Sequence, residues 1–176
     1  QTKEQAMKVH KIPEERVMVL GSPQFEVYND KPTLKRDEFL KLNGIPLDKK
    51  VLLLVGVSRF VDENELLKQL DDAIEGGELE GYHVLYRPHP WRVVEDGDES
   101  FFDLEFKNIT MDQQLKDHYK RYYTDSKYFK EERYQFAPSY DYYPNIFNAV
   151  EAVISIGTTM GIESMINGKP VLLKAF

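Results

Sequence analysis

The chain has 176 residues, of which 41% are hydrophobic and 30% charged, a composition typical of one globular domain. Its 23 basic and 30 acidic residues give a net charge of −7, which argues against a nonspecific nucleic-acid binder, because such a protein needs a basic surface. The absence of cysteine excludes disulfides, thiolate metal sites and cysteine nucleophiles. The longest apolar run, Val51 to Val57, is far too short to cross a bilayer.

In the first part of the chain, short apolar runs alternate with helix-type patterns. The turn signal Gly21-Ser22-Pro23 ends the first apolar run, and Gly76-Gly77 ends the clearest amphipathic helix. The patterns predict a strand over Arg16–Leu20, a helix from an N-cap at Thr33 to Leu42, a strand over Val51–Val57, a helix over Asp62–Ile74, and strands over Tyr82–Tyr86 and Phe106–Met111.

The regular alternation is interrupted between these elements and the C-terminal part. Residues 95–105 hold six acidic residues and no basic one, which predicts a solvated loop. Residues 119–143 hold eight of the eleven tyrosines, which could stack on a base or sugar or form a satellite core. The alternation then resumes with a helix over Tyr143–Val150, a strand over Ala152–Ile156, a helix from Thr158 or Thr159 to Asn167, and a strand over Val171–Leu173.

This alternation predicts an α/β fold: a Rossmann-like, open, mostly parallel sheet with helices on both faces. We expect residues 1–32 to form an inter-domain segment with a helix and a strand. Residues 33–176 are expected to form the sheet domain, with a Tyr-rich insertion at about 95–136. Since no covering helix follows the last strand, we expect the chain to be a piece of a longer protein.

Sheets of this kind bind ligands at the carboxyl ends of their strands. After the strand at 152–156 come Gly157, Thr158, Thr159 and Gly161, which open a helix. The unbonded N–H groups and the dipole of a helix start favour an anion, and the two glycines permit close backbone approach. The alternative is an ordinary threonine N-cap.

Glu163 lies one helical turn beyond Thr159, on the same face of that helix. A carboxylate directly beside phosphates would repel them, but one turn deeper it could accept hydrogen bonds from a ribose diol. The alternative is a glutamate that interacts favourably with the helix dipole.

Three further candidate residues follow two earlier predicted strands, Val51–Val57 and Tyr82–Tyr86. The prolines of Arg87-Pro88-His89-Pro90 fix the backbone and are expected to direct Arg87 and His89 into the crevice, where both could bind phosphate. Arg59 could be another cation for the same anion, or a surface residue paired with Asp62 or Glu63.

Three stretches together resemble the C-terminal, nucleotide-binding half of GT-B-fold glycosyltransferases. Among these, the chain is most similar to the bacterial enzymes that build surface polysaccharides, including CDP-glycerol glycerophosphotransferase-like enzymes. The matching stretches are Ile12-Pro13-Glu14-Glu15-Arg16-Val17 with Gly21-Ser22-Pro23-Gln24-Phe25, then Tyr86-Arg87-Pro88-His89-Pro90, then Ser155-Ile156-Gly157-Thr158-Thr159-Met160-Gly161-Ile162-Glu163 with Gly168-Lys169-Pro170-Val171.

The resemblance implies that Thr158 and Thr159 bind donor phosphate, that Glu163 binds the donor's ribose or sugar, and that His89 lies near the donor phosphates. It implies a donor-binding domain of a nucleotide-sugar-dependent glycosyltransferase for a cell-surface polysaccharide or a lipid-linked glycan, with no metal or other cofactor. The glycan or lipid-linked acceptor and the catalytic base would belong to an N-terminal domain. His89 is the one candidate catalytic group here. We expect a cytoplasmic protein, at the inner face of the membrane in its full-length form.

Two alternatives remain open. A nucleotide-sugar 2-epimerase shares this fold but needs acid and base groups at the sugar. A non-catalytic interaction module could retain the scaffold alone, because a fold does not establish a function.

Overall fold

The computed structural model describes residues 2–58, 61–92, 99–125, 127–132 and 135–174. The strands are β1 (Lys50–Val55), β2 (Tyr82–Arg87), β3 (Ile109–Met111), β4 (Ala152–Ser155) and β5 (Val171–Leu173). The helices are α1 (Thr2–Lys8), α2 (Arg36–Leu42), α3 (Glu63–Glu75), α4 (Gln113–Thr124), α5 (Tyr143–Ala149) and α6 (Thr159–Ile166), with short helical turns η1 (Glu14–Arg16), η2 (Pro23–Asn29), η3 (Phe101–Asp103), η4 (Tyr128–Glu132) and η6 (Tyr140–Tyr142). None of these described helices has the length and apolar character that a membrane crossing requires.

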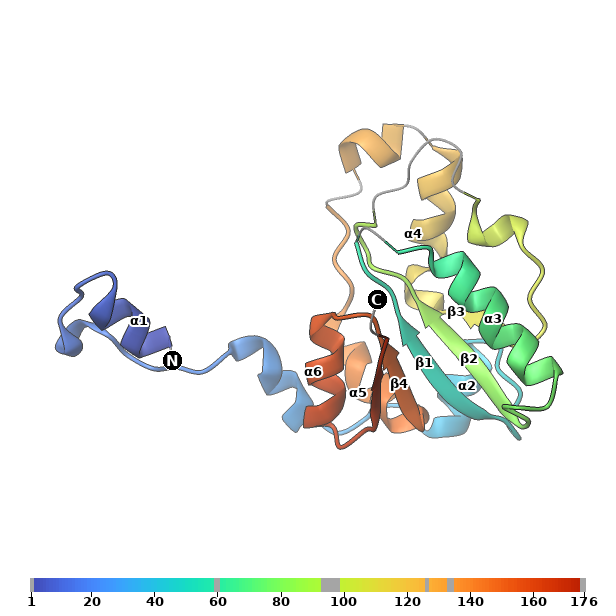
Figure 1. Ribbon diagram of the computed structural model, residues 1–176, viewed down its shortest axis with the longest axis horizontal. Helices are drawn as coiled ribbons and strands as arrows, with labels where there is room; N and C mark the ends of the chain where they lie inside the picture. Colours follow the sequence, from blue (N-terminus) through green and yellow to red (C-terminus); the bar gives the residue numbers. More distant parts are fainter. Residues whose placement is uncertain (1, 59–60, 93–98, 126, 133–134, 175–176) are drawn as a thin grey trace.

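The strands form one sheet in the order β3-β2-β1-β4-β5, and every neighbouring pair is parallel (Figure 1). The α/β class and the parallel sheet predicted from the sequence are therefore confirmed. The strand order reverses between β1 and β4, because β2 and β3 extend the sheet on one side of β1 and β4 and β5 on the other. Ligands of such sheets bind at this switch point, beyond the carboxyl ends of the strands.

The sheet is covered by helices on both faces, as the packing of β1 shows. Its residues alternate between two clusters: Val51, Leu53 and Val55 pack with residues of α2 and α5, whereas Leu52 and Leu54 pack with residues of α3. A strand buried on both faces needs apolar side chains at successive positions, so the uninterrupted run in the sequence follows directly from this packing.

Two helix starts illustrate how local signals and tertiary contacts compete. Asp62 caps α3 as an N-cap should, since its carboxylate accepts a hydrogen bond from the Glu65 N–H at 3.1 Å. Thr33 does not cap α2, which begins only after Lys35. Instead, the side chains of Thr33 and Asn145 hydrogen-bond each other, and the Leu34 N–H donates to Asn145 Oδ1 at 2.8 Å. A buried asparagine of α5 therefore anchors the chain just before α2.

The strand predicted over Arg16–Leu20 does not form. Arg16 ends the short turn η1, and Val17–Leu20 have no regular secondary structure. Met18, Val19 and Leu20 are each at least 71% exposed, and Figure 1 shows this part of the chain extending away from the sheet. A strand is stabilised by a neighbouring strand, and the described residues offer none here.

The acidic stretch differs in one respect from the sequence prediction, and the Tyr-rich stretch agrees with one of its two predicted interpretations. Residues 99–105 are not simply a solvated loop, because Phe101 in η3 packs against Tyr86 with ring centroids 5.4 Å apart; residues 93–98 lie outside the described part. Of the two interpretations of the tyrosines, the satellite core agrees better with the burial of Tyr119, Tyr122 and Tyr128.

Candidate functional site

The register of the sheet brings two of the predicted turns to the same edge. Val55 of β1 pairs with Arg87 on one side and with Ser155 on the other. The turns that follow β2 and β4 therefore flank the exit of β1, and their starting points are separated by two strand spacings, roughly 10 Å. This edge is the switch point of the sheet.

The turn after β4 is shaped by Ser155, a fully buried residue. Its Oγ accepts hydrogen bonds from the N–H groups of Gly157 at 3.3 Å and Thr158 at 3.4 Å. Gly157 has a φ of +94°, a conformation that side chains with a Cβ rarely adopt. The glycine is thus required by the turn itself, and the turn directs the chain into α6.

The start of α6 leaves hydrogen-bonding groups unused. Thr158 occupies the N-cap position, but its side chain makes no capping hydrogen bond. Its Oγ1 is buried without a partner, and the hydrogen bonds of the described residues include none from the N–H groups of Thr159 and Met160. The interpretation of Thr158 as an ordinary cap is therefore not supported, whereas a helix start with unbonded donors is what an anion needs.

Gly161 has a structural reason that differs from ligand approach. A Cβ at this position would lie 2.9 Å from Ser155 Oγ and 3.3 Å from Ser155 Cβ. The missing side chain lets α6 pack directly on the end of β4. Ser155 and Gly161 together hold the helix start at the edge of the sheet.

Glu163 lies one turn into α6 and is only 5% exposed. Its Oε2 is buried and makes no hydrogen bond. Burial raises the pKa of this carboxyl, although the Tyr28 hydroxyl and the Arg87 charge act in the opposite direction. A buried carboxylate oxygen without a donor is costly, so this oxygen is an available acceptor for a hydroxyl.

Arg87 does not enter the crevice as expected. It is the last residue of β2, and the alternation of the strand places it on the same face as Leu85, under α5. There it forms a buried ion pair with Asp112, donates to Gln114 Oε1 at 2.8 Å, and lies 4.8 Å from the centre of the Tyr143 ring. Burial alone would lower its pKa, but the carboxylate of Asp112 and the other neighbours raise it above the ordinary value. The charge of Arg87 therefore influences the carboxyl of Glu163, but the Arg87 side chain does not point into the crevice.

His89 is half-buried beyond the end of β2, with one ring nitrogen engaged. Its Nδ1 accepts a hydrogen bond from the Trp91 N–H at 3.1 Å, so the proton of the neutral ring lies on Nε2. Burial lowers the pKa of His89, which favours this neutral form. The contacts of the described residues do not join His89 to α6. Arg59, the other candidate cation, lies outside the described residues.

A second buried carboxylate, Glu63, was not predicted as a site residue. It is 1% exposed at the start of α3, accepts hydrogen bonds from the Val57 N–H at 2.7 Å and from the Tyr86 hydroxyl, and forms an ion pair with Arg92 at 2.6 Å. A Cβ at Gly56 would lie 2.5 Å from its Oε2, so the glycine makes room for it. Burial raises the pKa of Glu63 despite these partners.

Glu63 joins the loops that follow β1 and β2. A signal was present in the sequence, since Glu63 precedes Leu66 and Leu67 by three and four residues and therefore shares the apolar face of α3. The contact that fixes the role of Glu63, with Arg92, is not visible in that pattern.

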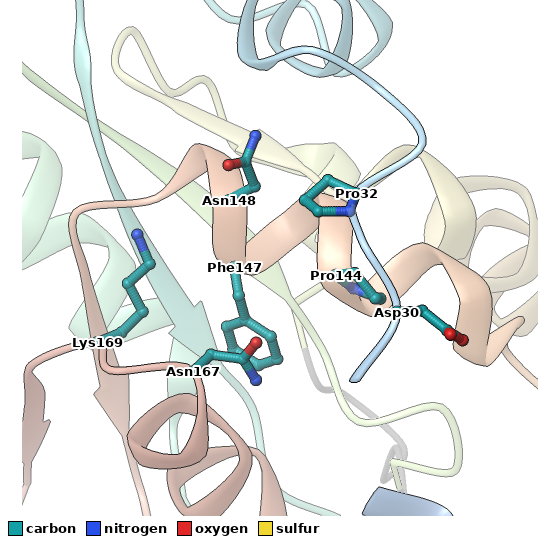
Figure 2. A pocket seen from close by; sticks show the side chains of 7 residues that line it. All are labelled: Asp30, Pro32, Pro144, Phe147, Asn148, Asn167 and Lys169. Atoms are coloured by element: carbon teal, nitrogen blue, oxygen red, sulfur yellow. The ribbon is translucent and has the colours of Figure 1, made fainter. Parts of the chain in front are cut away.

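A cavity of about 240 Å³ lies elsewhere on the molecule (Figure 2). It is lined by Asp30, Pro32, Pro144, Phe147, Asn148, Asn167 and Lys169. Asn167 caps the C-terminus of α6, and Lys169 precedes β5, so the cavity lies at the opposite end of α6 from Thr158. It contains none of the predicted site residues and is small for a nucleotide.

Within the described ranges, no group of three or more histidine, aspartate or glutamate side chains is arranged to hold a metal ion. The chain matches no protein-family model and no curated protein.

Proposed function

We propose that this chain is the donor-binding domain of a nucleotide-sugar-dependent glycosyltransferase that builds a cell-surface polysaccharide or a lipid-linked glycan. The observation that carries the proposal is the concentration of unused polar groups around the start of α6. Thr158 Oγ1 and Glu163 Oε2 are buried without hydrogen bonds, and the N–H groups of Thr159 and Met160 make none among the described residues, at the switch point of a parallel sheet. Buried polar groups normally have partners, so a cluster without them indicates a ligand.

The chemistry of these groups fits two parts of one ligand. The N–H groups and the Thr158 hydroxyl are donors suited to a diphosphate, and the helix dipole adds partial positive charge. Glu163 lies four residues after Thr159, about 6 Å further along the helix axis, and its carboxylate is an acceptor suited to a ribose diol. During transfer, the helix start would stabilise the departing nucleoside diphosphate, a task that preorganised donors perform without a metal ion. Acceptor and catalytic base belong, in this proposal, to another domain of a cytoplasmic enzyme at the inner face of the membrane.

The first test is a binding screen by calorimetry and thermal shift in buffer without Mg²⁺, using UDP, CDP, GDP and CMP. We expect one nucleotide to bind at millimolar concentration or below and to raise the melting temperature. The corresponding nucleoside should bind more weakly, because it cannot use the helix start. If none of the four nucleotides binds near millimolar, the proposal is wrong, and an interaction module that retains only the scaffold becomes the better interpretation.

Variants divide the site into its two parts. Glu163→Gln should weaken nucleotide and nucleoside alike, by about tenfold or more, because a charged acceptor of the diol is lost. Thr158→Val and Thr159→Val should weaken the nucleotide and leave the nucleoside unchanged. The matched control is Asp72→Asn, an exposed carboxylate of α3. Wild-type affinity in all three site variants would remove the proposed site even if a nucleotide binds.

A further inference from the structure

Tyr28 is the residue that the sequence patterns did not single out and that lies against the candidate site. It belongs to η2, and its ring packs edge-on against Phe147 of α5 with centroids 5.7 Å apart. The residue is half-buried, but its hydroxyl oxygen is buried and makes no hydrogen bond. A second buried polar atom without a partner therefore accompanies Glu163 Oε2.

The Tyr28 hydroxyl and the Glu163 carboxyl are close enough to interact. The hydroxyl of Tyr28 lies within reach of the carboxyl of Glu163 for a weak, poorly aligned hydrogen bond. Burial raises the pKa of Tyr28, and the charge of Glu163 and this contact add to the effect; the same contact lowers the pKa of Glu163 against the effect of burial. Neither atom makes a hydrogen bond of normal geometry to the other. The tyrosine hydroxyl can donate and accept, and the carboxylate can accept twice. Two hydroxyls on adjacent carbons offer the matching set of donors and acceptors.

The segment that carries Tyr28 is held on the body of the domain. Asn145 of α5 anchors Thr33 and Leu34, and Figure 2 shows the chain at Asp30 and Pro32 running beside Pro144 of α5. The Tyr28 ring is thus positioned by two contacts with α5, its own packing on Phe147 and the Asn145 anchor that follows it in the chain. A side chain fixed in this way can select a ligand, because little freedom is lost when it binds.

We propose that Tyr28 is a specificity-determining residue of the donor site, where its hydroxyl and the Glu163 carboxylate together recognise the vicinal diol of a ribose. This inference rests on the proposed function, since it assigns the sugar of the donor nucleotide to that pair. The site then selects ribonucleotides. A 2′-deoxyribonucleotide leaves one of the two buried groups without its partner, and sites built to bind a hydroxyl discriminate strongly against ligands that lack it.

The test compares UDP, CDP and GDP with their 2′-deoxy counterparts by calorimetry, on the wild-type chain, on Tyr28→Phe and on the control Tyr82→Phe. Tyr82 starts β2 and therefore lies at the amino-terminal ends of the parallel strands, opposite the carboxyl ends where the candidate site lies. We expect the wild type and the control to prefer the ribonucleotide by tenfold or more. Tyr28→Phe should bind the ribonucleotide at least fivefold more weakly, bind the deoxy form as before, and so lose most of the preference.

Two results would contradict the inference, and they are distinguishable. Absence of any nucleotide binding to the wild type would overturn the proposed function and this inference with it. Ribonucleotide binding with an unchanged preference in Tyr28→Phe would overturn the inference alone. If the melting temperature of ligand-free Tyr28→Phe were also lowered in that second case, Tyr28 would have a purely structural contact with Glu163.

Discussion

Replacement of Glu63 by alanine is expected to destabilise the domain strongly. The variant removes an acceptor from the Val57 N–H and the Tyr86 hydroxyl and leaves Arg92 with a mostly buried, uncompensated charge. Breaking a buried ion pair by removing one partner costs about 3–5 kcal/mol. The carboxyl is 1% exposed, so water cannot replace it, and we expect a loss of about 4 kcal/mol in the free energy of unfolding.

The measurement is urea unfolding followed by circular dichroism. With a slope of about 2 kcal/mol per molar urea, the loss lowers the midpoint by about 2 M. The matched control is Glu65→Ala, which removes an exposed carboxyl from the same helix and should change the free energy by no more than about 0.5 kcal/mol.

A second variant tests the assignment of Arg92 as the partner. Once Glu63 is alanine, Arg92→Leu should cost little more, because the interaction is already absent and the substitution removes the unpaired charge. A loss below about 1 kcal/mol for Glu63→Ala would refute the reasoning. Fully additive costs of the two substitutions would refute the pairing.

Two further predictions concern stability. Burial lowers the pKa of His83 to about 4, below the ordinary 6.5, so the unfolded chain binds more protons between these values; stability should therefore fall as the pH falls from about 6.5 to 4, by at most about 3 kcal/mol. Urea unfolding across this range should show a smaller loss for His83→Gln, and no difference from wild type for the exposed His10→Gln. Gly161→Ala should lower the free energy of unfolding by about 1 kcal/mol, because the contact with Ser155 outweighs the better helix propensity. An increase in stability would show that α6 does not pack on β4 as described.

The fold could be predicted because its main signals are local. The continuous apolar run of β1, the aspartate that caps α3 and the glycines that end the helices each act within a few residues of themselves. The position of the turn after β4 follows from the same alternation. These signals were sufficient for the α/β class, the parallel sheet and the residues that open α6.

The failures depend on partners far away in the sequence. Arg87 was expected in the crevice, but strand alternation and Asp112, 25 residues later, bury it under α5. Thr33 is a good cap by type, yet it bonds with Asn145, 112 residues away. Arg16–Leu20 has the composition of a strand, but composition does not supply a neighbouring strand.

The helix start of the candidate site could be predicted from the sequence, whereas the residues around it could not. Thr158 and Glu163 lie at spacings that helix geometry fixes. Tyr28 and Ser155 complete their environment through contacts that depend on how η2 and β4 pack, and Gly161 is explained by Ser155 and not by a ligand. No local pattern in the sequence indicates these contacts.

The hydrogen bond from the Trp91 N–H to His89 restricts the chemistry open to this histidine. Because Nδ1 accepts this hydrogen bond, the other ring nitrogen, Nε2, carries the proton and can act only as a hydrogen-bond donor. The neutral ring of His89 can therefore stabilise negative charge by donating a hydrogen bond from Nε2, but in this state it can neither protonate a leaving oxygen nor remove a proton from an attacking hydroxyl through Nε2. In the proposed transferase, the deprotonation of an acceptor must therefore be carried out by another group.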